Sequence, residues 1–168
     1  MSGIIKATNL EVTTIKDKTN SNTAMTIDTS GNVSIKVAGA HALVDFGGNA
    51  YVSKTSGILQ FDTIVENIGN HYSTSTYKFT CPVDGLYQTT IGAISQNDTD
   101  KYGMDLYKSD NRVRRNYTVY RTFQATNILM CSASDTLAWY LSGNSIALYE
   151  GTGIERYTYA SYSLIYAT

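Results

Sequence analysis

The sequence is poor in proline, cysteine, histidine and charge. Of its 168 residues one is proline, two are cysteine and two are histidine, while 16% are charged and the formal net charge is −1. Nucleic-acid-binding domains normally carry a basic excess that pairs with phosphates. Disordered chains carry high net charge and few aromatics. The composition therefore argues against both classes.

Long apolar stretches are also missing. No run approaches the roughly 20 apolar residues that a membrane-spanning helix needs. The opening stretch MSGIIKATNLEV becomes polar at Lys6, which predicts that no signal peptide is present. We therefore expect no membrane insertion.

Two histidines leave little room for catalysis. A Ser/His/Asp arrangement needs a histidine beside a nucleophile, and only His41 and His71 are available. We expect His71 to be a turn residue with its hydrogen bonds satisfied. The sequence lacks a nucleophile elbow, a phosphate-binding glycine loop and a zinc-protease motif. It also gives no way to pair its 14 acidic residues across a glycosidase cleft. We predict no enzyme, no catalytic residue and no cofactor.

Metal binding and disulfide formation have weak support as well. Cys81 and Cys131 cannot form a zinc site alone, and neither histidine lies at ligand spacing from them. Two free thiols acting as small hydrophobes are favoured over a disulfide, although pairing stays open. Asp98 and Asp100 could offer oxygens to calcium, but Tyr102 breaks the EF-hand pattern, which favours a solvated turn. We predict no metal site.

What the sequence has in quantity is tyrosine, glycine and alternation. It contains 14 tyrosines and 13 glycines, and period-two alternation of apolar and polar residues recurs throughout. From Gly47 onward, turn signals come about every ten residues, which is typical of an all-β sandwich or jelly roll. In YKFTCPVDGLYQTT, the stretch from Pro82 to Gly85 predicts a turn between two strands, because proline fixes φ and lacks a donor.

The first 46 residues differ from the rest. MTIDTSGNVSIKV predicts a hairpin, with Met25 and Ile27 on one face and a turn at residues 29–32. This segment has too little apolar surface for a core of its own. We predict an N-terminal arm over residues 1–46, which depends on a partner, and a jelly-roll domain over residues 47–168.

The stretch FDTIVENIGNHYSTSTYKFTCPVDGLYQTTIGA resembles the centre of the C1q/tumour-necrosis-factor-like globular domain. That family has the patterns Phe-x-x-Val-x-x-Asn-x-Gly-x-x-Tyr and Phe-Thr-x-Pro-x-x-Gly-x-Tyr. The matching positions are Phe61, Ile64 or Val65, Asn67, Gly69, Tyr72, Phe79, Thr80, Pro82, Gly85 and Tyr87. MDLYKSDNRV, ILMCSASDTLAWYL and YASYSLIYA are similar to later family strands.

This resemblance covers about residues 47–168. It implies a ten-stranded jelly roll that assembles as a homotrimer, with aromatics along the threefold axis. Three positions depart from the family pattern. Asn111 and Ser134 replace glycines, and Tyr159 to Tyr162 replace Phe-x-Gly-Phe. These changes affect turn types more than the fold.

The N-terminal stretch SGIIKATNLEVTTIKDKTNSNTAMTIDTSGNV resembles openings found in structural proteins of tailed bacteriophages, particularly those of cyanobacteria. The resemblance implies a virion protein, assembled in the host cytoplasm, whose residues 1–46 bind another tail or capsid protein. We therefore predict a non-enzymatic, trimeric C1q-like head, displayed on a tail fibre, a tail tip or the capsid surface, that adheres to host-surface glycans. Two alternatives remain: a purely structural capsid decoration or cement protein, and a C1q-like lectin or ligand of non-viral origin.

The densest positive stretch, KSDNRVRRNYTVYR, is the first candidate for a receptor site. Guanidinium groups could bind sugar carboxylates or phosphates while tyrosines stack on sugars. The alternative, an exposed hairpin tip or a face ion-paired with a neighbouring protomer, is the preferred interpretation. The candidate receptor-binding residues are Lys108, Arg112, Arg114, Arg115, Tyr117 and Tyr120.

A second aromatic group lies on the predicted closing strands. Large burial with a polar partner for the hydroxyl or indole group is typical of cores and interfaces. We expect most of these residues in the core or the trimer interface: Trp139, Tyr140, Tyr157, Tyr159, Tyr162 and Tyr166.

Overall fold

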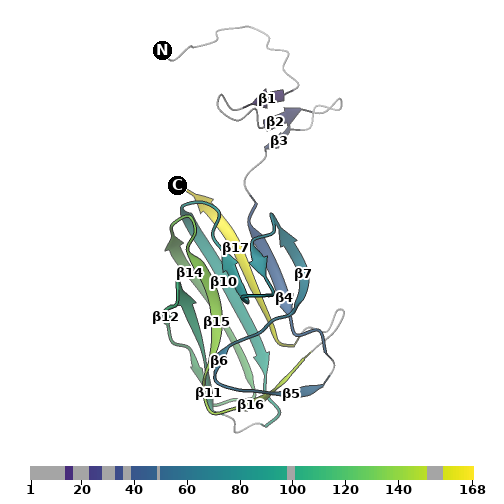
Figure 1. Ribbon diagram of the computed structural model, residues 1–168, viewed down its shortest axis with the longest axis vertical. Coiled ribbons are helices and arrows are strands. Elements are labelled where there is room, and N and C mark those ends of the chain that lie inside the picture. The colour runs from purple at the N-terminus through teal and green to yellow at the C-terminus, as the bar shows by residue number, and fades with distance from the viewer. Residues whose placement is uncertain are drawn as a thin grey trace. The chain divides into compact units, whose positions relative to one another are not determined.

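The computed structural model describes residues 14–16, 23–27, 33–35, 39–48, 50–97, 101–150 and 157–168. Within these ranges all regular structure is β-strand, which confirms the all-β prediction, and there is no helix that could cross a membrane. The chain divides into two compact units, Met1–Ala38 and Gly39–Thr168 (Figure 1).

The first unit contains a small antiparallel sheet. Its strands are β1 (Thr14–Lys16), β2 (Thr23–Ile27) and β3 (Val33–Ile35), in that order. Met25 lies opposite Ile35, which agrees with the predicted hairpin. The predicted turn at residues 29–32 lies outside the described residues.

The second unit is built from two large antiparallel sheets and a two-stranded ribbon. The five-stranded sheet has the order β14 (Thr122–Cys131), β10 (Gly85–Ile94), β17 (Tyr159–Ala167), β4 (His41–Asp45) and β7 (Thr63–Ile68). The seven-stranded sheet contains β12 (Asn111–Arg114), β11 (Tyr102–Lys108), β15 (Thr136–Gly143), β9 (Lys78–Thr80) and β8 (Tyr72–Ser73), with β13 (Tyr117–Thr118) on β11 and β6 (Gly57–Ile58) on β15. The ribbon pairs β16 (Ile146–Tyr149) with β5 (Tyr51–Lys54). Because several segments are only two residues long, the described strands outnumber the ten that the resemblance implies.

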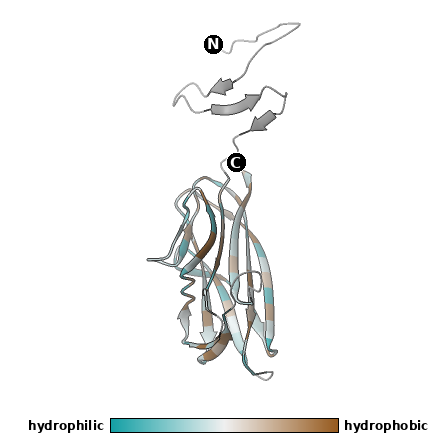
Figure 2. Cartoon of the chain, turned by 90° about the vertical axis from the view of Figure 1, so that its right-hand side faces the viewer, coloured by the Kyte–Doolittle hydropathy of each residue, from teal (hydrophilic) through white to brown (hydrophobic). Residues whose placement is uncertain are grey.

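Alternation along the strands explains why the two large sheets pack face to face. Figure 2 shows hydrophobic and hydrophilic residues alternating along strands of the second unit. In β14 exposed and less exposed side chains alternate over nine residues before the buried Cys131. Such alternation gives each sheet one apolar face. The apolar faces meet where Phe79 of β9 stacks on Tyr162 of β17, with ring centroids 5.2 Å apart.

The predicted domain boundary is wrong. Residues 41–46 were assigned to the arm, but β4 pairs with both β17 and β7 inside the five-stranded sheet. Ala40, Ala42, Val44 and Phe46 are all buried, because alternate residues of this strand face the core. The second unit therefore starts at Gly39.

The residues that carry the family resemblance lie around one corner of the core. Phe61, Phe79 and Tyr87 are fully or almost fully buried. The Asn67 side chain spans the loop after β7, because its amide donates to the carbonyl of Tyr72 at 2.9 Å and accepts from the Tyr72 backbone N–H at 3.0 Å. The sequence pattern therefore marks a loop closure as well as a set of core positions.

Between β9 and β10 the chain turns through Pro82, as predicted. The corner is held by the Tyr87 hydroxyl, which donates to the carbonyl of Val83 at 2.8 Å. Gly85 is required by close packing, since a Cβ there would lie 2.3 Å from the carbonyl oxygen of Tyr166. Gly69, the other signature glycine, has φ +84°, in the left-handed region that favours glycine.

Candidate functional site

The predicted arginine cluster is divided by a buried carboxylate. Asp105 of β11 is 1% exposed, and its Oδ2 lies 3.4 Å from Arg112 Nη1 and 3.6 Å from Arg115 Nε. The two guanidinium groups fold over this carboxylate on the outer face of the seven-stranded sheet. An ion-paired interpretation therefore holds for these two residues, although their partner lies within the chain rather than on a neighbouring protomer.

Arg114 points to a different place. With Lys108 it lines a cavity of about 170 Å³ between β12 and β14, which we call the Arg114 hollow. Its remaining walls are Val113, Asn127, Ile128, Leu129 and Met130. Lys108 Nζ lies 3.4 Å from Asp135 Oδ2, while Arg114 forms no salt bridge with any described residue. The Nδ2 atom of Asn127 is buried and has no hydrogen-bond partner in the described part of the chain.

The two predicted tyrosines lie at the far end of β11. Tyr117 pairs with Gly103, whereas Lys108 pairs with Asn111, and five residues of an extended strand span about 17 Å. Tyr117 and Tyr120 are 60% and 69% exposed. The six predicted receptor residues are thus brought to one edge of the sheet but do not form one site.

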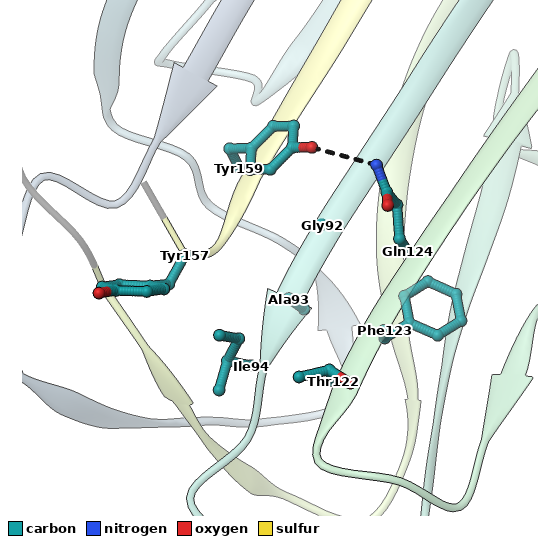
Figure 3. A pocket seen from close by; sticks show the side chains of 8 residues that line it. All are labelled: Gly92, Ala93, Ile94, Thr122, Phe123, Gln124, Tyr157 and Tyr159. Atoms are coloured by element: carbon teal, nitrogen blue, oxygen red, sulfur yellow. Dashed lines mark hydrogen bonds between the residues drawn. The ribbon is translucent and has the colours of Figure 1, made fainter. Parts of the chain in front are cut away.

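A tyrosine-lined hollow, which the sequence did not single out, opens on the outer face of the five-stranded sheet. It has a volume of about 310 Å³, and its walls are Gly92, Ala93, Ile94, Thr122, Phe123, Gln124, Tyr157 and Tyr159 (Figure 3). The ring of Tyr159 lies over Gly92, where an added Cβ would come within 2.5 Å of the ring. Gly92 therefore makes room for this ring. We call this cavity the Tyr159 hollow.

A second tyrosine-lined hollow adjoins the first and shares Ile94 and Tyr157 with it. It measures about 330 Å³ and is also lined by Tyr51, Arg121 and Tyr149. The ring of Tyr149 lies 4.7 Å from that of Tyr51 and 4.9 Å from that of Tyr157, between centroids. The Arg121 guanidinium hydrogen-bonds the Tyr51 hydroxyl and lies over its ring. We call this cavity the Tyr51 hollow.

Both tyrosine hollows lie at the end of the second unit opposite the point where the chain enters it. The chain enters the second unit beside Ala40, whose carbonyl accepts a hydrogen bond from Leu164 N–H at 2.8 Å. The next residue, His41, pairs with Ser163, and Ser163 pairs with Gln88, so the entry lies at the level of Gln88 on β10. Ile94 lies six residues beyond Gln88 on β10, which is about 20 Å. In Figure 1, β5 and β16 are accordingly far from the C-terminus.

An exposed apolar patch covers the other half of the five-stranded sheet's outer face. Ile128, Met130 and Tyr166 are 52%, 55% and 65% exposed. Leu86 pairs with both Met130 and Tyr166 and joins β14 to β17, and Ile165 extends the patch. We call this group the sheet-face patch. Tyr166 was expected in the core or an interface, and in the single chain it is exposed.

A serine, a histidine and a glutamate meet on the same face. His41 Nδ1 lies 2.7 Å from Ser163 Oγ, and His41 Nε2 lies 3.2 Å from Glu66 Oε2. Acyl transfer would also need unengaged N–H groups beside the serine to stabilise an oxyanion. Ser163, however, sits inside β17, with β10 on one side and β4 on the other. The three side chains form a polar bridge across β17, β4 and β7.

The two cysteines lie together in the core as free thiols, which was the favoured prediction. A hydrogen bond between their side chains raises the pKa of Cys81, and burial raises it further. The same hydrogen bond lowers the pKa of Cys131, helped by Lys108, although burial opposes this. No group of three or more metal-binding side chains occurs among the described residues. Asp98 and Asp100, the residues considered for calcium, lie outside them.

Two antiparallel sheets with this strand order define a jelly-roll β-sandwich. A sequence profile of the C1q domain matches residues 42–141, so the chain belongs to the C1q domain family.

Solved structures support the same fold at low identity. The globular domain of zebrafish complement 1qA superposes with a TM-score of 0.55 at 16% identity, covering 77% of this chain and 98% of that one. The Eiger TNF of S. frugiperda gives 0.60 at 10% identity, covering 79% and 96%. Murine APRIL gives 0.57 at 10% identity, covering 76% and 99%.

Proposed function

We propose that this chain forms a non-enzymatic, homotrimeric C1q-like head that presents its tyrosine-lined end for recognition. The observation that carries the proposal is the sheet-face patch. Soluble monomers seldom expose contiguous apolar surface of this kind, and such patches mark interaction sites. A homotrimer, which the family resemblance implies, would bury Met130 and Tyr166 of each copy against its neighbours.

The solution mass tests this proposal. Light scattering coupled to size exclusion should give three times 18.4 kDa for the full chain. Met130→Lys should shift the protein toward a folded monomer, because the introduced charge would be buried at the contact. Tyr120→Lys is a matched control, since Tyr120 is more exposed than Met130 but lies outside the patch. A monomeric wild-type chain would overturn the proposal.

The Tyr51 hollow is the reason to propose that the end of the head is the recognition surface for adhesion. Aromatic faces and a positioned arginine are the groups that recur at binding hot spots, and tyrosine rings can stack on the apolar faces of sugars. The Tyr159 hollow lies on the same sheet face as the sheet-face patch. If the threefold axis runs along the strands and the patch is buried against it, the three Tyr159 hollows also face the axis, while the Tyr51 hollows stay at the end. We therefore place host-glycan adhesion at Tyr51 and Tyr149 and move it away from the divided arginine cluster.

A glycan array probed with the intact trimer tests this placement. Tyr149→Ala should abolish binding to any glycan that the wild-type chain retains, and Tyr120→Ala should leave that binding unchanged. If both variants bind as the wild type does, the recognition surface lies elsewhere on the head.

The virion role rests on the resemblance of the N-terminal stretch to tailed-phage structural proteins. We propose that the unit Met1–Ala38 attaches the head to another tail or capsid protein. The division of the chain into two compact units supports separate roles for attachment and recognition. Deleting residues 1–38 should abolish incorporation into particles and leave the head trimeric. Incorporation of the truncated chain at wild-type levels would rule the attachment role out.

A capsid cement protein without a receptor is the second candidate. The internal pairing of Arg112 and Arg115 with Asp105 favours it, because these cations have a structural partner. Under this alternative, Tyr149→Ala particles should infect as well as wild-type particles do. Under the adhesion proposal their adsorption should fall.

A further inference from the structure

We propose that, in the homotrimer, Glu66 of each copy places its carboxylate in the Arg114 hollow of the next copy. The inference rests on the proposed trimer and specifies how it is built: the β14 edge of one five-stranded sheet meets the β7 edge of its neighbour. The occupant of the hollow is therefore a second copy of this chain.

The Arg114 hollow contains donors for a carboxylate, but no carboxylate among the described residues pairs with Arg114. Asp135 offsets the charge of Lys108, which leaves the hollow with the unbalanced charge of Arg114. The buried Nδ2 of Asn127 adds a second donor that has no partner among the described residues. Buried donors are normally satisfied, so an acceptor at this place is expected. A guanidinium and an amide donate well to one carboxylate.

The opposite edge of the same sheet carries a carboxylate with apolar flanks. Glu66 of β7 is 59% exposed at its side chain, and Ile64 and Ile68 beside it are 43% and 55% exposed. Alternation along β7 puts all three side chains on the outer face. The His41 ring, 3.2 Å from Glu66, holds the carboxylate on this face.

Strand register places the two edges at matching levels. Starting from Ile128 on β14, paired residues run across the sheet through Gln88, Ser163 and His41 to Ile68 on β7. A rotation about an axis along the strands keeps every residue at its own level. It therefore brings the Ile68 level of one copy to the Ile128 level of the next, and Ile128 lines the hollow.

Glu66 lies one alternation step from this level, on the row of Thr126. That step is about 7 Å along a strand, a distance that a glutamate side chain and an arginine side chain can cover together. A cyclic trimer needs two different patches that meet head to tail. The cationic β14 edge and the acidic β7 edge are such a pair.

The apolar neighbours make the contact stronger than an exposed ion pair. Ile64 and Ile68 on one copy would pack beside Ile128 and Met130 on the other and exclude water from the charges. Charge pairs in water-poor surroundings attract more strongly, and apolar surroundings of this kind are found around interface hot spots. The sheet-face patch and the ion pair would then form one continuous interface.

Charge reversal tests the inference. In equilibrium light scattering of the full chain, Glu66→Lys and Arg114→Glu should each weaken trimerisation by about tenfold or more, because like charges would meet at the contact. The double variant should return to near the wild-type affinity. Lys101→Glu, an exposed lysine outside the hollow, makes the same charge change as Arg114→Glu and should have no effect.

Mixing the two single variants adds a check that depends on a ring of three. Favourable contacts require the variants to alternate, and three copies cannot alternate around a ring. The mixture should therefore stay weaker than the double variant. If the wild type is trimeric and both single variants are too, Glu66 is not the occupant and only this inference falls. If the wild type is monomeric, the proposed trimer itself falls.

Discussion

Removing one hydroxyl group from the core should stabilise this protein. Tyr162 is 1% exposed, and its ring stacks on those of Phe79 and Tyr72. Its hydroxyl has no hydrogen-bond partner among the described residues, and burial raises its pKa well above the usual tyrosine value. The group therefore stays neutral but has lost its hydrogen bonds to water. Tyr162→Phe would also restore the phenylalanine of the C1q-like closing-strand pattern.

The expected gain follows from two opposing terms. An unpaired buried hydroxyl costs about 1–3 kcal/mol relative to water. Deleting it leaves a small void, and removing one buried methyl group from a core costs about 0.5–1.5 kcal/mol. We expect Tyr162→Phe to raise the free energy of unfolding by about 1 kcal/mol. For a chain of this size that is a rise of about 2–4 °C in Tm.

Urea unfolding and thermal melts, at one fixed protein concentration, measure the change. Tyr72→Phe is the matched control, because the Tyr72 hydroxyl donates to the buried carbonyl of Phe61 at 3.0 Å. Losing that bond should destabilise the fold by about 1–2 kcal/mol. If Tyr162→Phe lowers stability as much as Tyr72→Phe does, the Tyr162 hydroxyl has a partner and the reasoning is refuted.

Three further predictions concern the end of β14 and the turn after it. The hydrogen bond from the Ser132 N–H lowers the pKa of Asp135, so the Asp135 carboxylate should stabilise the fold above a pH of about 4. That stabilisation is lost as pH falls through the pKa of Asp135 in the folded state. Asp135→Asn should therefore lower the free energy of unfolding at pH 7 and reduce its dependence on pH in the acid range. Ser134 has φ +72° where the family has glycine, so Ser134→Gly should raise the free energy of unfolding by about 1 kcal/mol, measured as a higher urea midpoint. Oxidation with a small-molecule disulfide should join Cys81 to Cys131, which lowers the mass by about 2 Da, and closing that loop should add up to about 4 kcal/mol of stability. An unchanged mass would contradict this prediction.

Local patterns predicted the parts of the fold that are set by neighbours in the chain. In the family-like stretch MDLYKSDNRV a hairpin turn follows Lys108, and Ser109 and Asp110 both adopt positive φ, as a two-residue type I′ turn requires. The corner at Pro82 and the loop closed by Asn67 also follow from short motifs. In each case the residues that interact lie within about five positions of one another.

Local patterns could not decide the domain boundary or the surroundings of each arginine, because the deciding contacts are distant in sequence. Residues 41–46 alternate like any strand, but only pairing with β17, more than a hundred residues later, shows that they belong to the core. Arg112 and Arg114 are two positions apart, yet one folds over Asp105 and the other lines a hollow beside β14. A charge count cannot separate them, because their partners are set by the packing of the sheets.

By itself the sequence determined the all-β class, the turns and the C1q-like core, because alternation, Pro82, Gly85 and the aromatic spacing act through local geometry. Only the tertiary structure decided which cations are neutralised, which tyrosines share a hollow and which apolar residues remain uncovered. Each of those depends on strands that are remote in the chain coming together. The proposed trimer contact and the proposed recognition surface both depend on these long-range juxtapositions.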